Sequence, residues 1–256
     1  MKEERVRGCR GTQSIKLMKC WDTLRSAAFP FSTCLTWLLV LFVSVTPDLS
    51  QAQAQRIPLD SANGLKLLNV KAESSTFKGR KALRVTDTAP AGAGDEAKLA
   101  ILTGTEFQDG TIELDLVGEV APGAMEGARG FVGIAFRVAP DGSHFECIYL
   151  RPTNGRAEDQ VRRNHSVQYI SVPGFPWQRL RKEFPERYET YVDLVAGEWT
   201  KMRIEVRGDK ARLYVHDAQQ STLLVNDLKQ GQSKGTIALW VGPGTIAHFS
   251  NLRISN

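Results

Sequence analysis

The chain has 256 residues, of which 42% are hydrophobic and 24% charged, a balance typical of a globular protein with an ordinary core. Its formal net charge is +5, but the first 54 residues hold seven Lys and Arg against four Asp and Glu. The rest of the chain therefore carries 26 basic against 24 acidic residues, too small an excess to indicate a nucleic-acid partner.

The N-terminal region has the pattern of a secretory signal. An apolar run, Cys34–Val45, follows several basic residues and precedes a small-residue cleavage site that ends at Ala54. The run has about twelve residues, whereas a membrane-spanning helix needs about twenty. We therefore predict cleavage after Ala54, a secreted or periplasmic location and no membrane span after cleavage. A retained membrane anchor is the alternative.

The expected organisation is a signal peptide at residues 1–54 and one domain at residues 55–256. Cysteines occupy positions 9, 20, 34 and 147, so only Cys147 lies in the predicted domain. The domain therefore cannot form an internal disulfide and depends on its core. Cys147 lies in the middle of a strand-like run, which is more typical of a small buried residue than of a reactive thiolate.

From Ile57 onward, apolar and polar residues alternate with a period of two, and no segment shows a helical stripe. This pattern predicts an all-β protein. Short strands are expected at 65–70 and 82–85, followed by a strand at Thr111–Val117 with one apolar and one acidic face. A hairpin is predicted from 202 to 216 around Gly208-Asp209. About ten to twelve such strands indicate a sandwich, jelly roll or barrel.

Two neighbouring strands near the middle of the chain hold the first hints of a site. The strand at Phe131–Val138 places Gly133 and Ala135 on the same face as Arg137. Small residues leave room for a ligand against a sheet, so we expect Arg137 to point at it. The next strand, Phe145–Arg151, carries a charge on either face, and its inward face stays open.

Four segments resemble, in this order, the core strands of the concanavalin A-like lectin/glucanase superfamily. They are EFQDGTIELDLVG, GFVGIAFR, GEWTKMRIEVRGDKARLYVHD and KGTIALWVGPGTIAHFSNLRI. Within it they most resemble the 3-keto-disaccharide hydrolase family, formerly a domain of unknown function, and more distantly laminin-G-like domains. The resemblance implies a jelly-roll β-sandwich of two curved antiparallel sheets whose concave face binds sugars. The chain lacks the ExDxxE carboxylate pair of the glucanases, which argues against glucanase chemistry.

The predicted site spans residues 137–193, and most of it is the long polar segment that begins at 151. It supplies planar donors and acceptors suited to hydroxyls and carboxylates, and nearby aromatic side chains can form a platform for a sugar ring. The predicted substrate-binding residues are Arg137, Tyr149, Arg151, Asn154, Arg156, Arg162, Arg163, Gln168, Tyr169, Trp177 and Trp240. The alternative is a solvated loop whose arginines pair with its own acids. Residues 172–189 are expected to form a lid over the concave face; the alternative is a packed loop whose Trp177 and Phe184 plug one end of the sandwich.

The catalytic candidates are Glu146, Asp159 and His165. Two carboxylates can do acid and base work on a glycosidic bond, and Glu189 and Asp193 lie in the same region. His165 can act as a general base near neutral pH, although a histidine in a polar loop is also commonly structural. The histidines and loop carboxylates lack the spacing of zinc or calcium sites, so we predict no metal and no cofactor.

Three functions are open at this point. The first is an exported domain that binds a sugar or glycoside on the concave sheet and hydrolyses or cleaves a keto-glycoside. The second is a non-catalytic carbohydrate-binding or cell-envelope adhesion module. The third is a laminin-G-type interaction module, which predicts an exposed apolar patch. A pocket closed by 172–189 that holds two carboxylates, or a carboxylate and His165, favours the enzyme.

Overall fold

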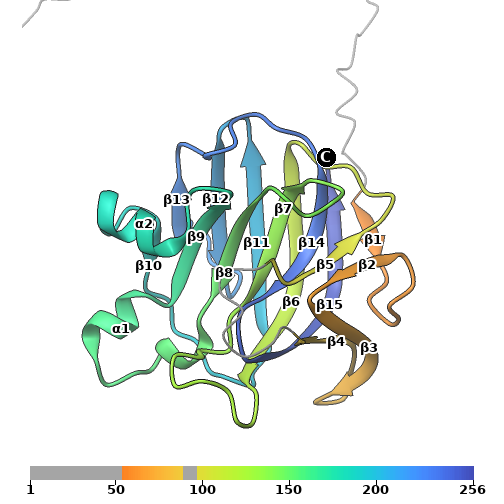
Figure 1. Ribbon diagram of the computed structural model, residues 1–256, viewed down its shortest axis with the longest axis horizontal. Helices are drawn as coiled ribbons and strands as arrows, with labels where there is room; N and C mark the ends of the chain where they lie inside the picture. Colours follow the sequence, from red (N-terminus) through yellow and green to blue (C-terminus); the bar gives the residue numbers. More distant parts are fainter. Residues whose placement is uncertain (1–53, 89–96) are drawn as a thin grey trace, which may run out of the picture. The chain divides into compact units, whose positions relative to one another are not determined.

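The computed structural model describes residues 54–88 and 97–256, and these fold into two antiparallel sheets that face each other (Figure 1). The predicted signal peptide falls almost entirely outside the described residues. The sandwich confirms the predicted all-β jelly roll of the concanavalin A-like type. No helix among the described residues is long and apolar enough to span a membrane.

Sheet A has the strand order β13-β12-β11-β6-β15-β4-β3, with β1 paired to β15. Its strands are β1 (Gln55–Ile57), β3 (Val70–Phe77), β4 (Arg80–Asp87), β6 (Gly110–Val120), β11 (Thr200–Arg207), β12 (Lys210–Val215), β13 (Leu223–Val225) and β15 (Thr245–Ser255). The predicted hairpin is present, because β11 pairs with β12 in the register Ile204↔Leu213. The apolar face of β6 is buried at Ile112, Leu114 and Leu116, as its alternation predicts.

Sheet B has the strand order β10-β9-β8-β7-β14-β5-β2. Its strands are β2 (Leu65–Leu68), β5 (Leu99–Leu102), β7 (Val132–Val138), β8 (Phe145–Leu150), β9 (Val167–Val172), β10 (Glu189–Thr190) and β14 (Thr236–Val241). Every residue of β7 and β8 is buried. One face of these strands packs on sheet A, so the outward face must be covered as well.

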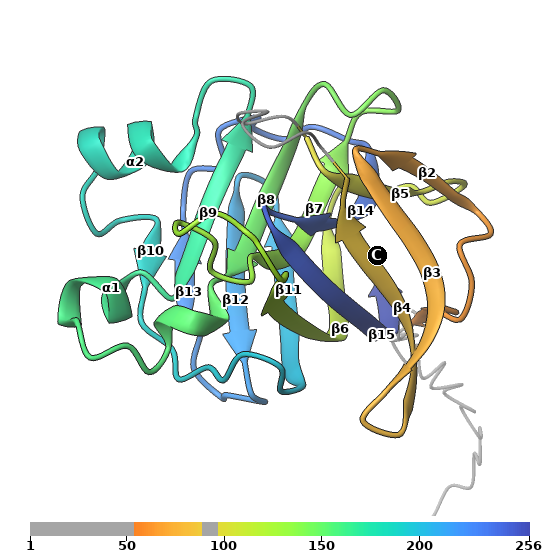
Figure 2. The ribbon, with the colours of Figure 1, turned by 60° about the horizontal axis from the view of Figure 1, so that its bottom comes forward.

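The polar segment between β8 and β11 is ordered by short helices and by β9. Its helices are the 3-10 turn η1 (Pro152–Asn154), α1 (Gln160–Asn164) and α2 (Trp177–Glu183). The two α-helices lie beside β9 and β10 at one edge of sheet B (Figures 1 and 2). They are too short to show a helical stripe in the sequence, which is why periodicity did not predict them.

A β-bulge in β7 turns one predicted site residue away from the ligand side. The β7–β14 register shifts between Thr236 and Ala238, and Arg137 has a φ of +53°. A bulge of this kind reverses the alternation of side chains beyond it. The Arg137 guanidinium is fully buried and donates to the backbone carbonyls of Gln108 (2.9 Å) and Gly208 (2.6 Å). The alternation therefore predicted the wrong face for Arg137.

Candidate functional site

Two adjoining hollows on the outward side of sheet B form one groove. The aromatic hollow, about 280 Å³, is lined by Tyr149, Trp240, Phe145 and Ile170 from the sheet. The arginine-rich hollow, about 830 Å³, is lined by Arg129, Arg151, Asn154, Asp159, Arg162, His165 and Arg181. Both hollows share Gly127, Phe131 and Trp177, so they form a continuous surface with an apolar end and a cationic end.

The floor of the aromatic hollow is set by strand register. Gly133 lies opposite both Tyr149 on β8 and Trp240 on β14. A Cβ at position 133 would lie 2.5 Å from the Tyr149 Cβ, so only glycine allows this approach. The Tyr149 and Trp240 rings meet above it with centroids 4.5 Å apart. The small residue predicted to make room for a ligand therefore makes room for this aromatic pair.

Helix α2 covers the groove where the two hollows meet. It begins at Trp177, directly after Pro176, which occupies the N-cap position with an extended backbone. Trp177 stays 36% exposed, although it lines both hollows. The guanidinium carbon of Arg181 lies 4.8 Å from the Trp177 ring centroid, at cation–π distance. An exposed indole held in this way can stack on a ligand at little entropic cost.

Arg151 ties the aromatic floor to the polar wall. Its side chain is almost fully buried and donates from Nη2 to the Tyr149 hydroxyl (2.9 Å) and to Gln168 Oε1 (3.3 Å). Its Nη1 donates to the backbone carbonyl of His165 (3.0 Å). Because Arg151 anchors the backbone at His165, it sets where that imidazole enters the groove.

A histidine and a carboxylate meet in the wall of the arginine-rich hollow. His165 Nδ1 lies 2.8 Å from Glu189 Oε2, an ion-pair distance that does not have hydrogen-bond geometry in this conformation. Arg181 donates two hydrogen bonds to the same carboxylate, from Nε to Oε1 (3.0 Å) and from Nη2 to Oε2 (2.7 Å). Burial lowers the pKa of His165 below its ordinary value of 6.5; Glu189 opposes this shift, and Arg181 and Arg151 add to it. This direction favours the neutral imidazole at neutral pH.

The outer wall of this hollow is built on α1. Asp159 caps the helix, accepting a hydrogen bond from the Arg162 backbone N at 2.6 Å. The Arg162 side chain donates from Nε to Asn154 Oδ1 (2.9 Å), and Asn154 Nδ2 donates to the His165 carbonyl (3.0 Å). Asp159 thus has a capping role, and its carboxylate is engaged by the helix that it starts.

Two predicted residues lie inside the sandwich and away from the groove. Glu146 faces the core and accepts hydrogen bonds from the Tyr169 hydroxyl (2.6 Å) and the Gln230 backbone N (2.7 Å). Burial raises the pKa of Glu146, and these hydrogen bonds oppose the shift. The Tyr169 hydroxyl also accepts from the Lys229 backbone N (2.9 Å). This network joins the 229–230 loop to sheet B and leaves Glu146 no access to a ligand in the groove.

Two predicted arginines lie outside the groove for a different reason. Arg156 forms a two-pronged ion pair with Asp193, at 2.8 and 2.9 Å. Arg163 lies over the ring of Tyr191, with its guanidinium carbon 5.5 Å from the centroid. The structure therefore brings together Tyr149, Arg151, Asn154, Arg162, His165, Trp177 and Trp240, with Asp159 at the rim and Gln168 behind Arg151.

Sequence reasoning did not single out two residues of this site, Arg129 and Arg181, and it named Glu189 only as one of four carboxylates near the region. Arg129 lies near the end of a loop rich in glycine and alanine. The presence of one basic residue in that loop was the signal that the sequence offered for it. Arg181 and Glu189 form their pair across eight positions between α2 and β10, a spacing that matches no local structural repeat. The segment predicted as a lid, 172–189, contains helix α2, which carries Arg181, and ends at Glu189 in β10.

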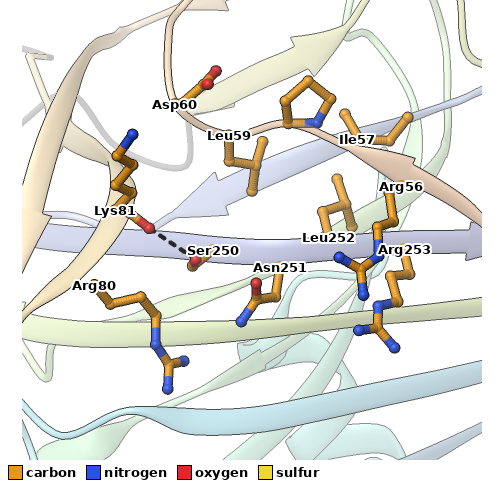
Figure 3. A pocket seen from close by; sticks show the side chains of 11 residues that line it. Arg56, Ile57, Leu59, Asp60, Arg80, Lys81, Ser250, Asn251, Leu252 and Arg253 are labelled. Carbon is orange, nitrogen blue, oxygen red and sulfur yellow. Dashed lines mark hydrogen bonds between the residues drawn. The ribbon is translucent and has the colours of Figure 1, made fainter.

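A separate hollow of about 390 Å³ lies on sheet A, between β4 and β1 along β15 (Figure 3). Strand β15 pairs with β4 up to Phe249 and with β1 from Leu252, so the hollow marks the place where the partner strand changes. Ser250 Oγ in this hollow donates to the Lys81 carbonyl at 2.9 Å, a hydrogen bond that joins β15 to β4. It holds no aromatic side chain.

The described residues contain no group of three or more His, Cys, Asp or Glu side chains placed to share a metal ion. Cys147, the cysteine among the described residues, is fully buried in β8, as its position in the strand predicts. Burial raises the pKa of its thiol well above the ordinary value. A buried neutral thiol is a packing group here.

Solved structures share the fold of this chain at low sequence identity. A carbohydrate-binding module, CBM66, from Bacillus subtilis superposes with a TM-score of 0.52 and 15% identity, covering 75% of this chain and 96% of its own. A Bacillus subtilis protein of unknown function with a galectin-like fold gives a TM-score of 0.50 and 12% identity, covering 78% and 94%. At these identities the likeness establishes the sandwich fold alone.

Among proteins with curated descriptions, none matches this sequence. The model of one domain family matches residues 63–255, which takes in both sheets from the loop before β2 to the end of β15. The same residues carry the four segments whose resemblance predicted this family. The chain therefore belongs to the 3-keto-alpha-glucoside-1,2-lyase-like domain family.

Proposed function

We propose that this domain binds a keto-glycoside in the groove on sheet B and cleaves its glycosidic bond by elimination. The observation that carries the proposal is the His165–Glu189 pair, 2.8 Å apart, in the wall of a groove floored by aromatic rings. A base beside a carboxylate and next to a sugar platform is what proton abstraction from a bound sugar needs. We take this outward face of sheet B as the concave sugar-binding face.

The bond chemistry of this proposal is taken from the description of the family, which is lyase-like. A ketone at C3 of a glucoside makes the hydrogen on C2 acidic, because the resulting carbanion is delocalised onto the ketone oxygen as an enolate. A base removes the C2 proton, the electron pair forms the C1–C2 double bond, and the C1–O bond breaks. The departing alkoxide takes a proton and leaves as an alcohol. The products are an unsaturated keto-sugar and an alcohol, and no water is consumed.

In this proposal His165 takes the C2 proton. Glu189 favours a proton on Nδ1, which leaves Nε2 as the basic nitrogen, and Glu189 then stabilises the imidazolium that forms. The lowered pKa of His165 keeps the base unprotonated at neutral pH. Arg151 and Arg181 line the same hollow and supply positive charge toward the enolate oxygen.

A non-catalytic carbohydrate-binding module is the second candidate. The binding module is favoured by the hydrogen bonds that Arg181 donates to both oxygens of Glu189. A carboxylate neutralised in this way stabilises an imidazolium less well. Such a module would use Trp177, Tyr149 and Trp240 to hold a sugar without reacting with it. Both candidates bind the same class of ligand, a sugar or glycoside. They differ in whether His165 acts as a base on the bound ligand.

The test is incubation of the protein with 3-keto derivatives of disaccharides, followed by mass spectrometry. Elimination yields two products whose masses add up to the substrate, whereas hydrolysis adds one water. We expect elimination products, and we expect them to vanish for His165→Ala. Hydrolysis products would show that the protein is a hydrolase and not a lyase. Ligand binding without any product would establish the binding module.

We also propose that the domain acts outside the cytoplasm. The proposal rests on the sequence pattern of residues 1–54, and N-terminal sequencing of the protein from its expressing cells tests it. A mature N-terminus at Gln55 is the expected result.

A further inference from the structure

The arginine-rich hollow carries more positive charge than the protein itself neutralises. Four arginines line it, Arg129, Arg151, Arg162 and Arg181, and among the described residues Asp159 is the one acidic residue in its lining. Glu189 lies behind the wall, 7% exposed, and is shared among His165 and two of the arginines. Because one buried carboxylate serves two arginines, the remaining charge of the hollow faces the groove.

Arg129 and Arg162 have hydrogen-bond partners that bear no charge. Arg129 Nη1 donates to the Glu126 backbone carbonyl at 2.5 Å, and Arg162 donates to Asn154 Oδ1 (2.9 Å) and Thr153 Oγ1 (3.1 Å). Burial lowers the pKa of Arg129, the nearby charge of Arg162 lowers it further, and the Glu126 carboxylate opposes both. Two like charges are thus held close together at one end of the groove.

Other arginines of the same region show the opposite arrangement. Arg156 pairs with Asp193 at 2.8 Å, and Arg179 pairs with Glu183 at 2.9 Å. The 151–193 segment therefore contains arginines whose charge is neutralised by carboxylates of the same segment. A neutral donor such as glutamine could make the contacts of Arg162 to Asn154, so its charge is not required for holding the loop.

A guanidinium is a donor only, and its fork matches the two oxygens of a carboxylate. A ligand with hydroxyls alone would need acceptors and donors in similar number and would leave the charge of the hollow unpaired. Resting on the proposed function, that the groove holds a glycoside, we propose that this glycoside carries a carboxylate, as a uronic acid does, and that Arg129 and Arg162 bind it. The sugar ring then lies on Trp177.

The test compares matched acidic and neutral sugars by calorimetry. The probes are oligomers of galacturonate, glucuronate and mannuronate, each with its methyl ester, which keeps the backbone and removes the charge. We expect at least one acid to bind about tenfold more tightly than its ester, the gain typical of one charge-assisted contact. The margin should shrink as salt is raised, because the hollow is open to solvent. A sulfated oligosaccharide that binds more tightly than every uronate overturns the carboxylate assignment.

Variants locate the effect. Arg129→Gln and Arg162→Gln should each lower the ratio of acid to ester affinity about threefold, so that together they account for the tenfold margin, with melting temperatures that confirm folding. Arg56→Gln removes the same charge from β1 on sheet A and should leave the ratio unchanged. An unchanged ratio in both groove variants overturns the inference.

The outcomes separate the two proposals. Equal affinity for every acid and its ester overturns the inference and leaves the glycoside groove standing. Binding of neutral 3-keto disaccharides without any uronate binding does the same. If neither class of sugar binds, the proposed function fails and the inference fails with it.

Discussion

The groove on sheet B and the hollow on sheet A are both lined by arginines, yet their origins differ. The groove joins β8, α2, α1 and the loop before β7, and their side chains meet around aromatic rings. In the hollow on sheet A, Arg56 and Arg253 lie side by side where β1 joins β15 (Figure 3). That hollow follows from a change of strand partner, whereas the groove requires residues from distant segments to converge. Side chains from distant segments that meet around aromatic rings therefore indicate a binding site better than the presence of a hollow does.

The charged groups in the two places also have different partners. In the hollow, Arg80 binds Asp115 at 2.7 Å, and the same carboxylate accepts from Asn251 Nδ2 at 2.6 Å. These bonds hold β4 to β6 across the bulge in β15. In the groove, the bonds of Arg151 and Arg181 set the position of His165. The comparison predicts that changes in the groove alter function, while changes in the hollow alter at most stability.

The largest effect is expected from His165→Ala. Loss of a general base typically lowers a rate by about 10²–10⁴-fold, and we expect this loss in the rate of keto-glycoside cleavage with binding retained. His144→Ala, in the loop before β8, is the matched histidine control and should keep the full rate. Steady-state kinetics on both variants decide the matter. A His165→Ala variant with the wild-type rate would place the base elsewhere.

Trp177→Ala should weaken ligand binding by about 2 kcal/mol, a typical loss for an exposed aromatic anchor, or about thirtyfold in Kd. The fold should persist, because the ring is 36% exposed. Tyr191→Ala, an aromatic that is 42% exposed outside the groove, is the control. Calorimetry with the same sugar measures both. Equal affinities for the two variants would remove α2 from the site.

The pH dependence of cleavage should reflect the environment of His165. The base acts when unprotonated, so kcat/KM is lost as pH falls through its pKa, which burial holds below 6.5. Arg181→Gln removes a charge that lowers this pKa and releases Glu189, which raises it. The acidic limb should therefore move to higher pH in that variant. A pH–rate profile, with NMR titration of His165, checks the direction, and a limb that stays in place would argue against this histidine.

The smallest effect is expected from Arg56→Gln in the hollow on sheet A. Arg56 lies directly opposite Arg253 in the β1–β15 pair, and like charges in such positions destabilise a sheet. Removing one charge should raise the free energy of unfolding by up to ~0.5 kcal/mol, with cleavage and binding unchanged. Denaturant unfolding measures this change. A loss of sugar binding in this variant would reverse the assignment of the two regions.

The candidate site was predictable as a region, and its members less so. Residues 137–193 stood out because most of them form a long polar segment with aromatics, which is unusual between regular strands, and His165 and Trp177 lie in it. Arg137 could not be placed, because one bulge reverses the alternation on which its face was predicted. Glu146 was ambiguous for a similar reason, since β8 is buried on both faces and either could have held the charge.

The amino-acid sequence by itself determined the sandwich, its hairpin from β11 to β12 and its family, because strand alternation and turn residues are local properties. Only the tertiary structure decided which arginines face the groove and which are paired. It alone brought Glu189 to His165 and Arg129 to Arg162, since these contacts join segments with no fixed spacing. Burial then lowered the pKa of His165, and no local pattern encodes burial.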